Sequence, residues 1–453
     1  MSSRYTNQID HSVNVIGIVP LGLAMNKTII ASILAGVCFT SFASNAQHQD
    51  VSTIFNINEL VPASASMPMT QWLPLVLAEI EKLPEIAVIN AQLAETDLAV
   101  KAAQQAIYNP ELGMNYTNAD TDSYALELSQ TIDWGDQRGG NERVAQLESL
   151  ILQAETQVLR SQILAERLLA LVNQQQANKQ LLFAKKQQQY GQTQQQIAEQ
   201  QVNAGAISQV ELQLIKLELA NNAAEYALAE QAAMAADNQV LALFADSPPQ
   251  TTDFMALIAD YQVSQVDGRL PALTSAYQQV LLAKASANLV KAQTGVDPTI
   301  SLSAEREGDE NKFGVGVSIP LQVRNSFDEQ YGLALQQVVI AEQAYLAKER
   351  VLTLQQRQFS LTMPRLISRY HDWQLLVEQS GMAAADALQQ QWRSGDINTS
   401  DYLQSRRQIA SSYFAGLQLE QAIYQNWLTW MGDSGELYPF VTSKVKNHAV
   451  GEK

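Results

Sequence analysis

The sequence contains very little cysteine and histidine, and these shortages exclude several classes of site. Cys38 is the only cysteine among 453 residues, and it lies in a segment that we interpret as a cleaved leader. We therefore expect a mature chain without disulfides and without a cysteine-based metal site. The four histidines have no spacing that would place two on one helix face, which argues against a structural zinc site and a histidine-based catalytic centre. They are His11, His48, His371 and His448.

Basic charge and catalytic motifs are also scarce. The net charge of −17 leaves no basic face for a nucleic-acid partner. Because we find no nucleophile–base pair, phosphate loop or ligand cluster, we expect no enzymatic activity, no cofactor and no metal site. Aromatic residues make up 7% and glycine only 21 residues, while Ala, Gln, Leu and Glu dominate. This composition is typical of long helices.

The N-terminal region predicts export. Lys27 precedes an apolar run at residues 29–42, and small residues follow up to Ala46, as in a signal peptide. We expect cleavage after Ala46 and a true start at Met25, and Val37 before Cys38 disfavours a lipoprotein cleavage site. No later stretch offers about 20 apolar residues, so we predict no transmembrane helix. Such an exported chain is either soluble outside the cytoplasm or inserted as a β-barrel.

The longest regular pattern runs through residues 139–203 without a proline. Its apolar positions step by three and four residues, which is the seam of a coiled coil. The seam comprises Val144, Leu147, Ile151, Ala154, Val158, Ala165, Leu168 and Val172, with Ser161 as its one polar member. At 1.5 Å per residue this helix is about 100 Å long, several times an ordinary domain helix.

Short segments near residues 110–133 and 298–321 alternate between apolar and polar residues around a polar turn. This pattern predicts two β-hairpins, each with one apolar face. Alone, it fits a membrane barrel and a surface hairpin of a soluble protein equally well.

The pattern occurs twice. Pro84, Pro110 and Gly205 each have a counterpart about 190 residues later, at Pro271, Pro298 and Gly395, which indicates a duplication. We divide the chain into a leader at 1–46, a first repeat at 47–246, a linker at 247–268, a second repeat at 269–432 and a tail at 433–453. The expected helices are at 85–108, 139–203, 207–244, 272–296, 327–393 and 399–431.

Both long helices end in similar breaks, at residues 202–208 and 392–398. Gly205 and Gly395 end the helices, and Ser208 and Asn398 are positioned to cap the return helices. Each return helix covers only half of its partner, so we expect the helices at 85–108 and 272–296 to cover the rest. Pro364 should kink a helix that otherwise continues.

Four strands cannot close a membrane barrel, because the smallest have about eight and open edges are not tolerated in lipid. Three chains would supply twelve. Small residues on the polar faces would then line a water-filled lumen, and the long helices would continue it as a cylinder. The glutamine-rich segment 174–201 fits a wall wetted on both sides.

This arrangement resembles the TolC family of outer-membrane efflux channels over essentially the whole mature chain. The local motifs are similar to those of its CzcC-like branch, which serves heavy-metal efflux. They are Asn109–Leu112, Ser129–Gly135 with Arg138, and Gly314–Leu321.

The resemblance implies a homotrimer with a 12-stranded barrel in the outer membrane and a periplasmic helical tunnel. It implies two further partners, a periplasmic adaptor protein and an inner-membrane pump of the RND type. By the same resemblance, the two breaks form a periplasmic aperture and the adaptor contact. The matching residues are Gly205, Glu211, Trp392, Gly395 and Asp401.

The residues leave alternatives open at this site. Glu211 and Asp401 would give a ring of six carboxylates in a trimer, which would select cations, or they are ordinary first-turn residues that favour the helix dipole. Ile397 occupies a position where the family can have an arginine, which puts a salt-bridge latch in doubt. Two rival functions also remain, a channel for drugs or a secreted polypeptide and a soluble periplasmic coiled-coil adaptor.

Overall fold

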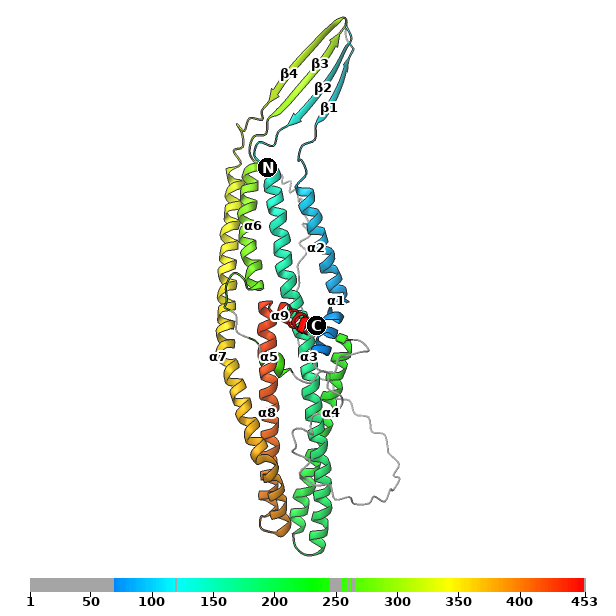
Figure 1. Cartoon of the computed structure of the whole chain (residues 1–453), viewed down its shortest axis with the longest axis vertical. Helices are drawn as coiled ribbons and strands as arrows, with labels where there is room; N and C mark the ends of the chain where they lie inside the picture. Colours follow the sequence, from blue (N-terminus) through cyan, green and yellow to red (C-terminus); the bar gives the residue numbers. More distant parts are fainter. Residues whose placement is uncertain (1–68, 119, 245–253, 260, 262–264, 452–453) are drawn as a thin grey trace, which may run out of the picture. The chain divides into compact units, whose positions relative to one another are not determined.

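The computed structural model describes residues 69–118, 120–244, 254–259, 261 and 265–451. The predicted signal peptide, including Met25 and Cys38, lies outside the described residues, as does much of the predicted linker. Most of the described chain is helical, and four strands form one sheet (Figure 1). Within the described chain, no helix has an apolar stretch long enough to cross a bilayer.

The long and return helices form two pairs of matching length. The long helices α3 (Gln137–Asn203) and α7 (Asp328–Ser394) each contain 67 residues. The return helices α4 (Gln209–Phe244) and α8 (Thr399–Ser434) each contain 36. α7 runs through Pro364 without interruption, as predicted. Each half of the chain therefore contains one long helix and one return helix of the same lengths.

The shorter helices cover the long ones where the return helices do not reach. α2 (Pro84–Ala103) packs against α3, and α6 (Pro271–Gln293) packs between α3 and α7 (Figure 1). This confirms the expected cover. Both helices end earlier than predicted, and the N–H group of each C-cap residue donates to carbonyl groups of the last helical turn. The prolines that follow restrict only the residue directly before them, so they do not set these ends, which lie several residues earlier.

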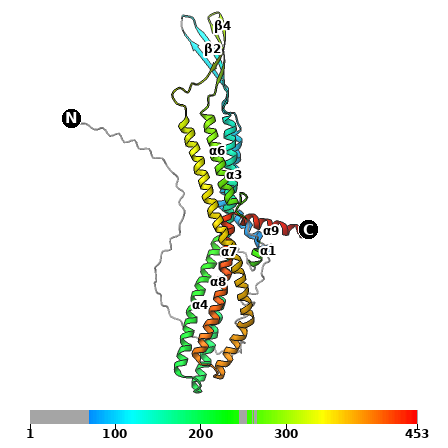
Figure 2. The ribbon, with the colours of Figure 1, turned by 90° about the vertical axis from the view of Figure 1, so that its left-hand side faces the viewer.

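Three further helices have no counterpart among the predicted elements. They are α1 (Met69–Glu81), α5 (Met255–Ala259) and α9 (Leu437–Gly451). α9 contacts α1, α3 and α8, and the view in Figure 2 shows α1 and α9 beside one another. Leu437 and Val441 of α9 are fully buried, so this segment is part of the core.

The main core lies where these helices meet α3. Trp72, Leu168 and Trp427 belong to one buried cluster, which joins α1, α3 and α8. The predicted seam of α3 faces inward, since its members are buried or partly buried. Its polar member Ser161 is fully buried and donates a hydrogen bond to the Gly435 carbonyl oxygen at 2.8 Å. Its hydroxyl also accepts from the Tyr438 N–H at 3.0 Å, so its polar group is satisfied.

Three glutamines in the glutamine-rich half of α3 are more buried than predicted. Gln176, Gln187 and Gln194 are at most 8% exposed, although the other glutamines of this segment are less buried. The interpretation of a wall wetted on both sides is therefore wrong for these three positions. They lie on the face that packs against neighbouring helices, because a three-to-four-residue period returns them to it.

The four strands form an antiparallel sheet in chain order. They are β1 (Glu111–Thr117), β2 (Ser123–Thr131), β3 (Thr299–Glu307) and β4 (Glu310–Ser318). The register puts Leu112, Leu128, Leu302 and Val315 in one row and therefore on one face. Both predicted hairpins are present, and β2 pairs with β3 to join them.

Candidate functional site

The two helical breaks have the same backbone geometry. Gly205 and Gly395 adopt left-handed φ values of +74° and +80°. In each break the residue after the glycine donates its N–H to the carbonyl five positions earlier, from Ala206 at 2.8 Å and from Asp396 at 2.9 Å. This is the Schellman pattern, which needs glycine because a side chain is strained at positive φ.

The return helices are capped as predicted. The Ser208 hydroxyl accepts from the Glu211 N–H at 3.2 Å, and the Glu211 carboxylate accepts from the Ser208 N–H at 2.8 Å, which forms a capping box. In the second break the Asn398 side chain accepts from the Asp401 N–H at 2.8 Å. Its amide also donates to the Asp401 carboxylate at 2.8 Å. The Glu211 carboxylate is therefore itself part of a cap, whereas the Asp401 carboxylate binds the side chain of the capping residue Asn398.

One residue that the sequence analysis did not select joins the two breaks. The Thr399 hydroxyl donates to Glu211 Oε1 at 3.0 Å, and the Trp392 indole N–H donates to the Thr399 hydroxyl at 3.2 Å. Thr399 is 1% exposed and Trp392 is 2% exposed. Three residues from both repeats thus form a chain of hydrogen bonds that is buried at Trp392 and Thr399 and partly exposed at Glu211. We call Trp392, Thr399 and Glu211 the tip link.

An aromatic cluster lies directly behind the tip link. Trp392 stacks on Tyr402 with ring centroids 4.9 Å apart. The hydroxyls of Tyr402 and Tyr190 share a hydrogen bond of 2.5 Å, and the Arg406 guanidinium lies 4.0 Å from the Tyr190 ring centroid. Arg406 also donates to Gln187 at 2.9 Å. These contacts hold α3 against α8.

The two candidate carboxylates differ in their surroundings. Glu211 is half-buried, and both of its oxygens accept hydrogen bonds. The backbone N–H of Ser208 holds the pKa of the Glu211 carboxyl below its ordinary value, and the hydroxyls of Ser208 and Thr399 lower it further. Asp401 is exposed. Of the five predicted site residues, only Trp392 and Glu211 are brought together, whereas Gly205, Gly395 and Asp401 shape their own breaks.

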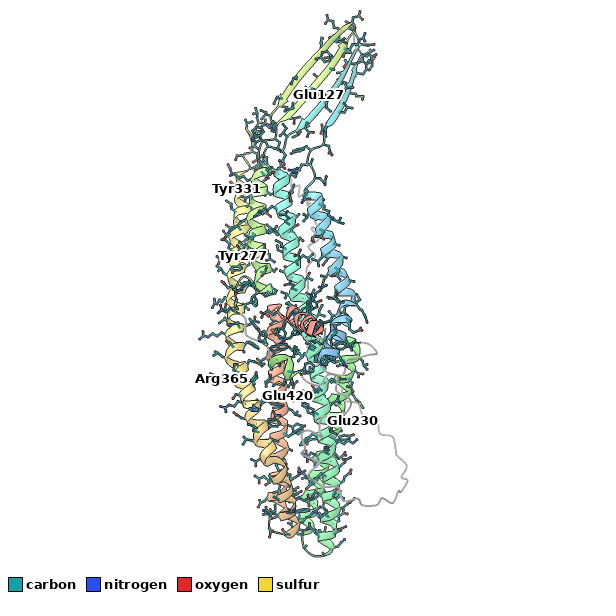
Figure 3. All side chains as sticks on the ribbon, in the orientation of Figure 1. Glu127, Glu230, Tyr277, Tyr331, Arg365 and Glu420 are labelled. Carbon is teal, nitrogen blue, oxygen red and sulfur yellow. The ribbon has the colours of Figure 1, made fainter. Side chains whose placement is uncertain are left out.

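The sheet carries a second candidate feature. Side chains alternate between its faces, so one face is apolar and the other has mainly glycine, serine and glutamate. Glu127 lies in the middle of β2 on the polar face, in a row with Gly113, Ser303 and Gly314. Figure 3 labels Glu127 on the sheet. It is exposed and surrounded by small neighbours, so its charge has no counter-ion in its own row.

Of the other acidic residues of the polar face, Glu111 lies at the end of the sheet nearer the helices, and Glu305, Glu307 and Glu310 lie nearer the turn between β3 and β4. There Lys312 pairs with Glu307. Among the residues that the structure describes, no group of three or more acidic, cysteine or histidine side chains is arranged to hold a metal ion.

No protein-family profile matches the chain, and no curated protein matches it by sequence. Solved structures do resemble it. CusC, described for the conformational changes that accompany its folding and transmembrane channel formation, has a TM-score of 0.65 at 12% identity over 82% of this chain and 92% of CusC. The outer-membrane channel OprN has a TM-score of 0.65 at 15% identity, with coverage of 81% and 90%.

The outer-membrane protein VceC of Vibrio cholerae gives a TM-score of 0.61 at 16% identity, over 80% of this chain and 96% of VceC. These neighbours are outer-membrane channels of the TolC family. At these identities the likeness shows a shared fold. The predicted fold class, a mainly helical TolC-like protomer with a small β part, is therefore confirmed.

Proposed function

We propose that the chain is the outer-membrane channel component of a tripartite efflux system, and that it exports heavy-metal cations as a passive duct. Three copies would assemble edge to edge. A periplasmic adaptor protein and an inner-membrane RND-type pump would deliver the cargo and the energy. The observation that carries this proposal is the pair of open edges in both the sheet and the helical layer.

The sheet is incomplete at both margins. β1 and β4 each pair on one side only within the described chain, and an unpaired strand edge is costly in lipid. Because the strands alternate in direction, β4 of one copy and β1 of the next would also run antiparallel. Three sheets of four strands would close a 12-stranded barrel with its apolar face outward and with no edge left.

The helices are incomplete on the same sides. The packing order is α2, α3, α6 and α7, so α2 and α7 form the margins (Figure 1). Leu333, Ile340, Leu354 and Leu361 of α7 are each more than 50% exposed and are spaced by seven residues or a multiple of seven, which is a coiled-coil seam without a partner among the described residues of the chain. On α2, Val88 and Leu98 are 56% and 65% exposed. A neighbouring copy would cover both seams.

The proposed cargo rests on charge and on motif resemblance. Closing the sheet would place three copies of Glu127 at one height of the lumen, each in a row whose other members are glycine and serine, where their field would favour cations. The motifs at Ser129–Gly135 and Gly314–Leu321 resemble the branch of the family that serves heavy-metal efflux. The structural similarity to outer-membrane channels supports a channel function, but it does not distinguish heavy-metal cations from other exported substrates.

The tips would form the periplasmic aperture and adaptor contact. The exposed Asp401 carboxylates of three copies would contribute acidic charge there, while Glu211 would act mainly through the tip link. Gly205 and Gly395 would allow each tip to turn sharply.

Fractionation and deletion test the proposal. We expect mature protein in the outer membrane as a trimer that resists mild detergent and dissociates on heating. Deleting the gene should lower tolerance to zinc, cobalt, cadmium or copper. Unchanged metal tolerance with lost drug tolerance would favour the drug channel. Soluble periplasmic monomer would favour the coiled-coil adaptor.

A further inference from the structure

A pocket of about 300 Å³ lies between α3, α4 and α8, behind the tip link. Figure 2 shows α4 and α8 next to one another in the part of the molecule remote from the sheet. Tyr402, which stacks on Trp392, forms part of the pocket wall, and the exposed residues Asn221 and Ser411 mark its opening to solvent. The volume is at the lower end of the range for small-molecule sites. The pocket therefore has room for a small ligand that contacts both repeats.

The buried end of the pocket carries amide groups that lack hydrogen-bond partners. Gln187 and Gln194 of α3 line the pocket and are only 8% and 3% exposed. The Arg406 guanidinium donates to Gln187 Oε1 at 2.9 Å, and because a guanidinium group only donates, the other end of this amide is the N–H donor. Within the described part of the chain, neither that donor nor either end of the Gln194 amide has a partner. Since buried polar groups are normally hydrogen-bonded, these amides indicate a polar occupant of the pocket.

The charged side chains that line the pocket balance one another. They are Glu218, Glu225, Arg406 and Arg407. Arg407 Nε donates to Glu218 at 2.9 Å, and the Arg406 guanidinium lies 4.0 Å from the Tyr190 ring centroid. The fourth group, Glu225, is exposed. Because two carboxylates face two guanidinium groups, the lining has no net charge to attract an anion or a cation, and a neutral occupant fits it best.

The remaining wall of the pocket is mainly apolar. Ile215 and Leu403 are 2% and 7% exposed, and Leu219, Ala410 and Phe414 are half-buried. An aromatic ring buries a large apolar area against such a wall and prefers tilted or offset contacts with other rings. The pocket thus combines an apolar wall with a hydrogen-bond donor and acceptor at its buried end.

We propose that this pocket binds small neutral molecules that carry a primary carboxamide on an aromatic ring. The carbonyl oxygen of the ligand accepts from Gln194 Nε2, and its N–H donates to Gln194 Oε1, so both ends of the buried amide gain a partner. A primary carboxamide presents one acceptor and one donor side by side, as this pairing requires. The ring packs against the apolar wall. The inference goes beyond the proposed export function and does not depend on it, because the site lies within one chain.

A bound ligand should stabilise the tip link. Tyr402 joins the pocket wall to Trp392, and the hydrogen bond from Thr399 to Glu211 connects α8 to α4. Movement of α4 away from α8 would therefore break the tip link and open the pocket together. A ligand that binds only the packed arrangement shifts the equilibrium toward it. The pocket would then be a regulatory site for the tips.

Binding of benzamide to the purified mature protein in detergent is the first test, measured by saturation-transfer NMR. We expect a dissociation constant on the order of 1 mM, as is usual for so small a ligand. Gln194→Met keeps the shape of the side chain and removes both polar groups, so it should weaken binding about ten-fold. Gln192→Met is the matched control, because Gln192 is an exposed glutamine of α3 outside the pocket, and it should bind benzamide as wild type does.

Two analogues test the chemical class of the ligand. Acetophenone has the shape of benzamide without its N–H group, and benzoate replaces the amide with a charge. Each should bind about five-fold more weakly than benzamide. Benzoate binding as tightly as benzamide would overturn the neutral class. Equal binding of benzamide to wild type and both variants would show contact with detergent or unspecific surface, and no binding to wild type would show that the pocket holds water only. Either result would overturn the proposal.

Amide hydrogen exchange of the wild-type protein is the second test, and it needs no substitution. At about 10 mM benzamide, exchange at residues 205–211 and 395–401 should slow about ten-fold, as expected at ten times the dissociation constant. Acetophenone at the same concentration should slow exchange about three-fold or less. Unchanged exchange at the tips in the presence of bound benzamide would overturn the link between this pocket and the tips.

Discussion

At the scale of single residues, the tip link depends on one hydroxyl. Thr399 is buried and uses its oxygen both to accept from Trp392 and to donate to Glu211. No other hydrogen bond of the Trp392 indole occurs in the part of the chain described here, so loss of the hydroxyl would leave a buried N–H unsatisfied. Such a group costs about 1–3 kcal/mol. A substitution that keeps the shape of the Thr399 side chain but removes its hydroxyl should therefore weaken the tip link.

We predict that Thr399→Val loosens the tips. Amide hydrogen exchange at residues 205–211 and 395–401 should become about ten-fold faster, as expected for roughly 1–2 kcal/mol. Thr399→Ser keeps the hydroxyl and serves as the control, with exchange near that of wild type. If the valine and serine variants exchange at the same rate, the hydroxyl does not hold the two breaks together.

The lowered pKa of Glu211 predicts a pH dependence. A carboxylate whose folded pKa lies below its ordinary value of about 4.3 contributes stability that is present above that value and is lost as the pH falls through the folded pKa. Trp392 fluorescence should therefore report loosening of the tips below about pH 4.3. Glu211→Gln should remove this step. A step of the same size in that variant would assign the titration to another group.

Glu127 should determine charge selectivity if the sheet closes around a lumen. In planar bilayers, Glu127→Gln should lower the ratio of cation to anion permeability about two-fold at 0.1 M salt. The effect should fade near 1 M salt, where the Debye length is about 3 Å. Glu127→Asp retains the charge and should behave as wild type. Channels of unchanged selectivity in the glutamine variant would show that this carboxylate does not face the permeating ions.

At the scale of elements, the sequence predicted the structures whose periodicity is strong. Many residues contribute to the seven-residue spacing of α3 and to the alternation of β2 and β4. The type and position of these three elements could therefore be predicted from the sequence. α9 was not predicted, because 15 residues after α8 carry too few apolar positions to establish a period. Thr399 could not be selected either. Its partner Glu211 is 188 residues away, and only the packing of two repeats brings them together.

The loop from β2 to α3 depends on close approach of the backbone. A Cβ on Gly135 would lie 2.8 Å from the Ala292 carbonyl oxygen, whereas a Cβ on Gly113 would meet nothing closer than 3.8 Å. We predict that Gly135→Ala destabilises the protein by about 1–3 kcal/mol, because backbone atoms would have to move. Gly113→Ala should be nearly neutral. Heat-induced trimer dissociation on gels compares the two variants, and equal midpoints would contradict the predicted clash.

At the scale of the whole molecule, the account rests on joining the open margins of separate copies. Within one chain, β1 and β4 are separated by two strands, a distance of about 14 Å, which is far beyond the reach of a disulfide. If cleavage removes Cys38, the mature chain is free of cysteine, so engineered cysteines would report only the intended pair. A covalent link between β1 and β4 would therefore have to join different copies.

Disulfide cross-linking of the sheet edges tests this claim most directly. Met114→Cys on β1 is combined in turn with Phe313→Cys, Val315→Cys or Val317→Cys on β4, so that three registers between copies are sampled, and each single variant serves as a control. We predict that at least one pair gives covalent dimers and trimers in outer-membrane fractions and that a reductant dissolves them. Monomer alone from all three pairs, with every cysteine open to a thiol reagent, would contradict edge-to-edge assembly.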